Sequence, residues 1–299
     1  MASNPRSILV ITGPTGIGKT DLAMRLADES PIRIISADSV MVYRHLNIGS
    51  AKPAVSELER YPHDLIDLVE PEYPFDVGQY LFHAKRSIQH AWQRNEVPCL
   101  VGGTILYLKS LLDGLDPLPK ADPDIRKRIR EKAEQQGWPA IHGWLKGLDS
   151  GAAEIIHPNH SSRLERALEV RLKTGESIRS FWTEGPSELM IGDQRADLNV
   201  LALMPADREK LKERLNRRFD SMLGRGLVDE VQSLRTRSGL TNACPSMRSV
   251  GYRQIWQYLD REISETEMLE QAQTATRQLA KRQLTWLRSW RADTNTFIK

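Results

Sequence analysis

The clearest chemical feature of the sequence is a glycine-rich loop between an apolar strand and a helix. Residues 8–11 are apolar and lead into the pattern Gly-x-x-x-x-Gly-Lys-Thr, known as a P-loop. In a P-loop, backbone N–H groups surround a phosphate, the lysine adds positive charge and the last hydroxyl binds Mg²⁺. The amphipathic residues 21–27 continue as the helix that the pattern requires. We therefore expect phosphate or diphosphate to bind, with Thr20 as the metal ligand, at Gly13, Pro14, Thr15, Gly16, Ile17, Gly18, Lys19 and Thr20.

A second feature is the position of the acidic residues near this loop. A nucleotide-hydrolysing P-loop protein ends a second core strand in an Asp that holds Mg²⁺. Here the clearest second strand, 97–101, ends in Gly-Gly-Thr, and the Asp of the run 65–69 stands inside it. Asp38 instead follows the strand 32–36, at the sheet edge where open α/β sheets bind ligands. It suits a general base that prepares an acceptor for attack, and capping of a helix is a compatible alternative.

A pair of arginines forms a third candidate group. Arg214 and Arg218 are four residues apart in a predicted helix over 207–222, so they share one face. Two guanidinium groups on one face can clamp a diphosphate and stabilise it as a leaving group. Ion pairing with Glu209 and Glu213 is the alternative, and the residues alone favour it slightly.

The elements that must position these groups form a core, an insertion and a second stretch of core. We predict an α/β fold, in which a P-loop NTPase-like parallel sheet is flanked by helices and carries an inserted helical domain. The prolines of 115–123 mark a stiff hinge, and strand patterns stop after it. The core is predicted at 1–119 and 196–299, and the insertion, a lid over the P-loop, at 120–195. The predicted strands are 8–12, 32–36, 97–101 and 198–204, and the predicted helices are 18–29, 78–95, 104–113, 124–136, 161–173, 207–222, 226–237, 247–258 and 265–290.

The end of the chain carries a basic segment. Residues 271–291 contain no Asp or Glu, and Trp286 and Trp290 stand between their basic residues, which are Arg277, Lys281, Arg282, Arg288 and Arg291. A basic helix with aromatic side chains suits an RNA backbone and its bases. The alternative is a solvated basic face beside an apolar stripe of Leu279, Leu284 and Leu287. Charge alone leaves these two interpretations equal.

Composition limits the class of protein. The 299 residues are 40% hydrophobic and 27% charged with a net charge of +3, which is ordinary for a water-soluble protein. No apolar run approaches the ~20 residues of a membrane span, and the polar start is too short for a signal peptide. Of the two cysteines, Cys99 falls in a predicted buried strand, so neither a disulfide framework nor a zinc site is expected. We expect a cytoplasmic monomer that makes no contact with membranes.

Several motifs together resemble one known family. They are GPTGIGKT at 13–20, SADSVMVYR at 36–44, IGSAKP at 48–53, VGGTILY at 101–107, HPN at 157–159, RLERALEV at 163–170, RSVGYRQ at 248–254 and ATRQLAKRQLTWLR at 275–288. This ordered set, which covers nearly the whole chain, is similar to the tRNA isopentenyltransferase family in its bacterial, tRNA dimethylallyltransferase form. The resemblance implies transfer of a dimethylallyl group from dimethylallyl diphosphate to N6 of adenosine 37 in tRNA. It also accounts for the missing Asp, since the P-loop would hold a prenyl diphosphate with Mg²⁺ in place of a hydrolysable nucleotide.

The resemblance also implies roles for individual residues. Asp38 would take a proton from the adenine amine, Thr104 would approach the target nucleotide, and Arg214 and Arg218 would stabilise the leaving group. The inserted domain would bind the tRNA as well as form a lid. By family position, tRNA would meet Asp38, Ser39, Val40, Met41, Thr104, Ser162, Arg163, Leu164, Glu165, Arg166, Arg248, Ser249, Val250, Gly251, Tyr252, Arg253, Lys281, Arg282, Gln283, Leu284, Thr285, Trp286, Leu287 and Arg288.

Two other interpretations remain open at this point. One is a P-loop kinase of nucleosides or small molecules, which needs no basic, tryptophan-bearing helix. The other is a non-catalytic RNA-binding protein with a relic P-loop, against which the intact Lys19, Thr20 and Asp38 argue. The chain departs from the family pattern at Met41, His45 and His160.

Overall fold

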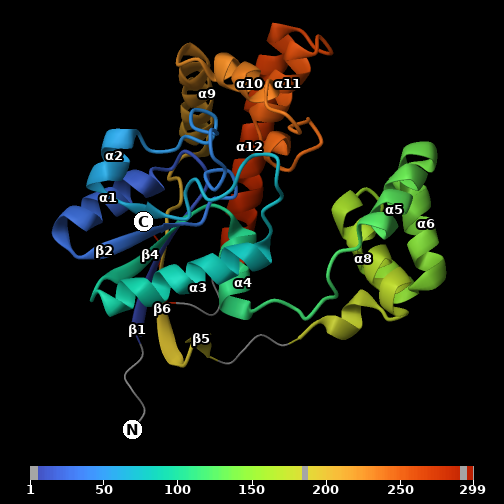
Figure 1. Cartoon of the computed structure of the whole chain (residues 1–299), viewed down its shortest axis with the longest axis horizontal. Coiled ribbons are helices and arrows are strands. Elements are labelled where there is room, and N and C mark those ends of the chain that lie inside the picture. Colours follow the sequence, from blue (N-terminus) through green and yellow to red (C-terminus); the bar gives the residue numbers. More distant parts are fainter. Residues whose placement is uncertain (1–5, 184–187, 290–294, 299) are drawn as a thin grey trace. The chain divides into compact units, whose positions relative to one another are not determined.

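The chain consists of two compact units in the computed structural model, which describes residues 6–183, 188–289 and 295–298. The first unit is Met1–Leu112 with Ser187–Lys299, and the second is Asp113–Pro186. Each is an independent arrangement of helices and strands (Figure 1). In the described residues no helix is long and apolar enough to cross a membrane. Both cysteines are free thiols.

The first unit is built on one sheet, to which the described residues contribute seven strands. The strand order is β3-β2-β4-β1-β6-β5, and β7 pairs with β6 beyond the end of β5. All pairs are parallel except β5 with β6. The bounds are β1 Arg6–Thr12, β2 Ile32–Ser36, β3 His63–Asp64, β4 Val97–Gly102, β5 Leu189–Ile191, β6 Gln194–Ala202 and β7 Asn295–Ile298.

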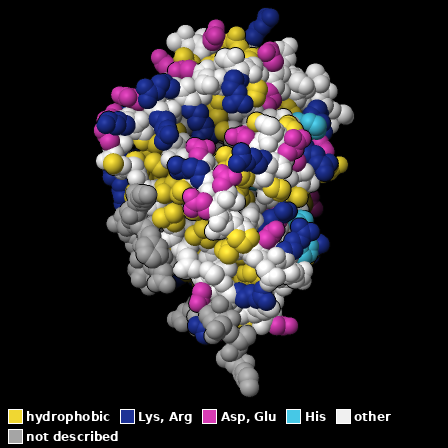
Figure 2. Space-filling model, turned by 90° about the vertical axis from the view of Figure 1, so that its left-hand side faces the viewer, with side chains coloured by type: hydrophobic (Ala, Val, Ile, Leu, Met, Phe, Trp, Pro, Cys, Tyr) yellow, Lys and Arg dark blue, Asp and Glu magenta, His cyan; other side chains and the backbone are white. Residues whose placement is uncertain are grey.

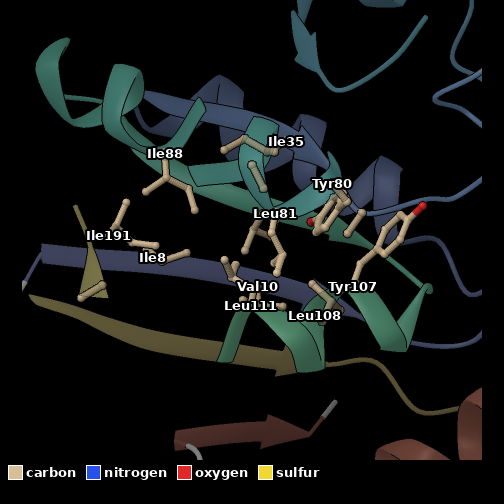
Figure 3. Close-up of a cluster of buried hydrophobic side chains, with 14 of the residues drawn as sticks. Ile8, Val10, Ile35, Tyr80, Leu81, Ile88, Tyr107, Leu108, Leu111 and Ile191 are labelled. Carbon is tan, nitrogen blue, oxygen red and sulfur yellow. The ribbon is translucent and has the colours of Figure 1, made fainter. Parts of the chain in front are cut away.

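Helices cover both faces of this sheet because its strands are apolar on both sides. Alternate residues such as Ile8 and Val10 pack against α3 (Val77–Gln93) and α4 (Ile105–Asp113) in the core of Figure 3. The residues between them, such as Ile11, pack on the opposite face against α1 (Lys19–Glu29). The carboxyl ends of β1, β2 and β4 therefore meet at one edge, directly before the predicted site residues.

The C-terminal helices of this unit form a second core with the loop that follows β2. They are α9 (Arg208–Gly224), α10 (Leu227–Arg235), α11 (Tyr252–Leu259) and α12 (Glu265–Ser289), and α12 contacts both α9 and α11 (Figure 1). Phe219, Val231 and Met268 pack there against Val42 and Leu46 of the loop. The short α2 (Val55–Arg60) follows the loop. This packing fixes the loop beside the P-loop.

The second unit is helical, as the sequence predicts. It contains α5 (Pro123–Gln136), α6 (Trp138–Leu148), α7 (Ser150–Ile155) and α8 (Ser161–Thr174) around its own apolar core. Glu169 is completely buried at its centre, where it accepts hydrogen bonds from the Asp122 N–H and from Arg126 and Arg166. Burial raises the pKa of this carboxyl, but those hydrogen bonds outweigh burial and lower the pKa below its usual value. His160 stands at the N-cap of α8 without a side-chain capping bond, which an Asp there could make.

The structure corrects several predicted boundaries. The compact units divide at 112/113 and 186/187, whereas the sequence predicted 119/120 and 195/196. The reason is that β5 and the start of β6 form an antiparallel hairpin of the sheet, within the range predicted as insertion. A 3₁₀ turn at Ser246–Arg248 precedes α11, so the helix predicted from 247 begins at Tyr252. Trp290 and Arg291, which the sequence placed in the basic segment, lie outside the described residues.

Charge is evenly distributed over the surface that can be seen. On the face shown in Figure 2, basic and acidic side chains are interspersed with apolar ones. No block of one sign covers that face, in keeping with the small net charge of +3.

Candidate active site

The P-loop leaves β1 and passes into α1 in the conformation that glycine permits. Gly16 and Gly18 have positive φ angles of 75° and 97°, which residues with a Cβ rarely adopt. A Cβ on Gly16 would also lie 2.7 Å from Leu215 of α9. The loop is thus packed against α9, and Arg218 Nη1 lies 3.9 Å from the same Cβ position.

Lys19 lies under the loop and is partly desolvated. Its Nζ donates to the carbonyl oxygens of Gly13 and Pro14, both at 2.9 Å. Burial lowers its pKa to about 8; the negative charge of Asp38 opposes this shift and the charge of Arg218 adds to it. A diphosphate would replace missing solvation with negative charge, so this lysine is prepared for an anion.

Asp38 and Thr104 are joined at the carboxyl edge of the sheet. Asp38 Oδ1 accepts hydrogen bonds from the N–H groups of Val40 at 2.8 Å and Met41 at 3.2 Å. The capping geometry considered for Asp38 therefore exists, although it closes a turn and not a helix. Thr104 Oγ1 accepts from the Ser39 N–H at 3.0 Å. Thr104 thus holds the residue that follows Asp38 and stabilises the turn that aims the carboxylate.

Both predicted arginines reach the cavity beside the P-loop. Arg214 and Arg218 line it together with Lys19 and Asp38. Burial lowers the pKa of the Arg218 guanidinium, while the charges of Asp38 and Asp21 raise it. The ion pair with Glu209 that the sequence offered as an alternative is made by Lys212 instead.

The cavity has about 420 Å³, room for a diphosphate and a hydrated cation. Its lining includes Thr20 and Ser36, and the buried Ser36 hydroxyl has no hydrogen-bond partner in the described structure. The described residues offer no group of three His, Cys, Asp or Glu side chains that could hold a metal alone. Mg²⁺ keeps several waters and binds through one or two protein groups plus phosphates, so the hydroxyls and the nearby carboxylate fit it.

A second, apolar cavity of about 100 Å³ adjoins the first. The two share Thr15, Asp38, Ser50 and Arg218 in their linings. The remaining lining is mostly apolar, and includes Val40, Leu215, Phe219, Met222, Val250 and Leu279. One polar cavity rich in cations therefore continues into an apolar one at Asp38.

Sequence reasoning missed several residues of this site. Arg225, Lys52 and Ser36 also line the larger cavity. The Nζ of Lys52 is spent on a 2.6 Å ion pair with Asp67 and a bond to the Tyr43 carbonyl, so it stabilises the loop. Arg225 follows α9 by one residue, and extending the search from Arg214 and Arg218 along that helix would have found it.

The residues expected to meet tRNA divide between surface and core. In the first unit, Ser39, Arg248, Arg253, Lys281, Arg282, Thr285, Trp286 and Arg288 are exposed. Gly251, Gln283, Leu284 and Leu287 are buried, and Tyr252 is 0% exposed with its hydroxyl donating to Glu230. The side chains of this second group support the fold, so the expectation that they contact tRNA is wrong for these side chains as the structure has them.

The same division holds in the helical unit. Ser162 and Arg163 are exposed, whereas Leu164 is fully buried. Glu165 pairs with Arg130 at 2.7 Å, and Arg166 is bound to Glu169 and to the Pro119 carbonyl. Only the first two of these five side chains are free to reach a ligand without breaking an internal contact.

Fold and cavities together define a P-loop protein that takes a phosphorylated ligand. Comparison with known proteins makes this specific. The IPP transferase family model matches residues 41–290, and an isopentenyl transferase model matches residues 6–66. The chain belongs to the IPP transferase family.

Named relatives cover nearly the whole chain. tRNA dimethylallyltransferase 2 of Hahella chejuensis is 47% identical over 295 residues, spanning 96% of this chain and 89% of its own. tRNA dimethylallyltransferase of Thiobacillus denitrificans is 46% identical, spanning 94% and 88%. The kinase interpretation is not favoured by these relatives.

Solved structures agree with this assignment. The full-length tRNA isopentenylpyrophosphate transferase of Bacillus halodurans superimposes with a TM-score of 0.68 at 33% identity, covering 98% of this chain and 89% of the other. A eukaryotic dimethylallyltransferase captured acting on tRNA gives a TM-score of 0.76 at 25% identity, covering 98% and 74%. The predicted fold class, a mostly parallel α/β sheet with flanking helices, is confirmed.

Proposed function

We propose that the protein transfers a dimethylallyl group from dimethylallyl diphosphate to N6 of adenosine 37 in tRNA, beside the anticodon. One observation carries the proposal: the cationic P-loop cavity continues into an apolar cavity at Asp38. A prenyl diphosphate has the same polarity, an anionic head and a short apolar tail. A cavity of about 150 Å³ accommodates benzene, so about 100 Å³ suits a five-carbon tail.

The residues of the cavity support a direct displacement. Asp38 takes one proton from the adenine amine, whose lone pair is delocalised into the ring and therefore weakly nucleophilic. The amine nitrogen forms a bond to C1 of the dimethylallyl group as the bond from C1 to the diphosphate oxygen breaks. Lys19, Arg214 and Arg218 receive the negative charge that develops on the leaving diphosphate.

Magnesium belongs to the proposal as a partner of the diphosphate. Thr20 and Ser36 would hold it from the protein side, with Asp38 across the cavity. When bound, it neutralises charge on the phosphate oxygens. The protein supplies few ligands of its own, so the metal should bind together with the donor and weakly without it.

The tRNA is proposed to lie along the exposed basic side of α12 and near Arg248 and Arg253. These are exposed cations of the same unit as the donor cavity. Exposed cations neutralise backbone phosphates by releasing counterions. Adenosine 37 must leave the anticodon-loop stack to reach Asp38, at a cost of a few kcal/mol.

Nucleoside analysis of the product tests the proposal. Unmodified tRNA is incubated with the protein, Mg²⁺ and dimethylallyl diphosphate, then digested and examined by mass spectrometry. We expect N6-dimethylallyladenosine at position 37 and none in a tRNA with another base at that position. A modified nucleoside elsewhere, or unchanged tRNA with a folded protein, would contradict the proposal.

A further inference from the structure

Gln283 is a buried polar residue that joins the C-terminal helix to the P-loop. It lies on α12 and is 8% exposed. Its Oε1 accepts the N–H of Thr15 at 2.8 Å, and its Nε2 donates to the carbonyl oxygen of Gly103 at 2.8 Å. One side-chain amide therefore fixes two backbone segments that both border the donor cavity.

The two segments are the ones that carry the proposed chemistry. Thr15 is the third residue of the P-loop, so the bond to its N–H sets the direction of the peptide that opens the loop. Gly103 precedes Thr104, which holds Ser39 beside Asp38. At Gly103 the packing is so close that a Cβ would lie 2.4 Å from Nε2 of Gln283. Any other residue at 103 would displace the amide.

The neighbours of Gln283 hold it in place. Leu284 and Ala280 pack against Leu211 and Leu215 of α9, and Leu287 packs against Ile105 of α4. An apolar residue would continue this stripe, whereas a buried amide is costly unless its hydrogen bonds are made. Its donor and its acceptor are both used on the site's backbone, which points to a role in shaping that backbone.

We propose that Gln283 is a positioning residue for the donor: it holds the P-loop in the shape that receives a diphosphate. Helix α12 is then part of the donor site on its buried side, while its exposed side carries Lys281, Arg282 and Arg288. The inference rests on the proposed diphosphate donor. It also revises the expectation that the end of the chain is independent of the P-loop.

Pyrophosphate and donor binding test the role. Gln283→Met keeps length and removes both hydrogen bonds. We expect about a tenfold loss of pyrophosphate affinity in calorimetry, since one hydrogen bond to a buried group is worth about that factor. The KM for dimethylallyl diphosphate should rise while kcat changes less and tRNA affinity stays the same. Gln271→Met, at an exposed position of the same helix, is the matched control and should behave as wild type.

Hydrogen exchange separates positioning from general support of the fold. In Gln283→Met the P-loop peptide should exchange faster than in wild type, while a peptide from β6 should not. If this variant unfolds, Gln283→Glu keeps the length and an acceptor for Thr15 but loses the donor to Gly103, and should also bind pyrophosphate more weakly. Wild-type affinity in a folded variant would overturn the inference alone. A wild-type protein that does not bind pyrophosphate would overturn the proposed donor and this inference with it.

Discussion

Replacing Asp38 with Asn isolates the charge of the proposed base. An asparagine retains Oδ1, so the hydrogen bonds from the Val40 and Met41 N–H groups at 2.8 and 3.2 Å persist and the turn keeps its shape. What is lost is the ability to take a proton, a contribution of about 10²–10⁴-fold to turnover. The charge of Asp38 also raises the pKa of Lys19, so the substitution should lower that pKa below about 8. The assay therefore belongs near neutral pH or below, where Lys19 stays protonated.

A single-turnover assay with saturating tRNA and donor measures this loss directly. We expect the rate of Asp38→Asn to fall by about two to four orders of magnitude, while tRNA affinity changes little. Asp21→Asn is the matched control, because Asp21 is an exposed carboxylate that lines the same cavity. A folded Asp38→Asn protein within a few-fold of the wild-type rate, or an equal loss in Asp21→Asn, would refute the reasoning.

Three further predictions follow from the site and its supports. Because Lys19 has a pKa of about 8 and is charged below it, donor affinity should fall as pH rises through about 8, and Lys19→Met should lack this step in calorimetric titrations at several pH values. Removing the exposed cations of α12 should lower the salt slope of tRNA binding by about 0.7–0.9 for each phosphate contact and leave donor affinity unchanged, and an unchanged slope in the triple alanine variant would contradict a role for Lys281, Arg282 and Arg288. Tyr252→Phe removes a 2.7 Å bond to Glu230, which also accepts the N–H groups of the loop 47–49, and should cost about 1.5–3 kcal/mol in chemical denaturation, against no change for the exposed Tyr73→Phe.

The parts of the site predicted from the sequence are those set by local rules. The glycine spacing of the P-loop and the position of Asp38 after a strand are local, and parallel strands bring their carboxyl ends to one edge. The helical spacing of Arg214 and Arg218 likewise put both in the cavity. These residues lie where the sequence predicted them, and their chemical roles stay predictions.

The parts that the sequence did not reveal depend on contacts between distant segments. Thr15 and Gln283 are 268 positions apart, and no pattern in either segment indicates their hydrogen bond. The family motifs at the end of the chain name whole blocks, whereas a helix buries only one side of each block. Tyr252 and Leu284 therefore lie in the core although their neighbours are exposed. The hairpin of β5 and β6 has short strands with little apolar periodicity, so its residues were assigned to the insertion.

The fate of two labels tests the central claim most directly. The protein is mixed with unmodified tRNA and Mg²⁺, once with dimethylallyl diphosphate labelled in the prenyl group and once with ATP labelled in the γ-phosphate. The account predicts that the prenyl label reaches tRNA and that no phosphate label does. Phosphate label on tRNA or on a nucleoside, with no transfer of the prenyl group, would contradict it and restore the kinase interpretation.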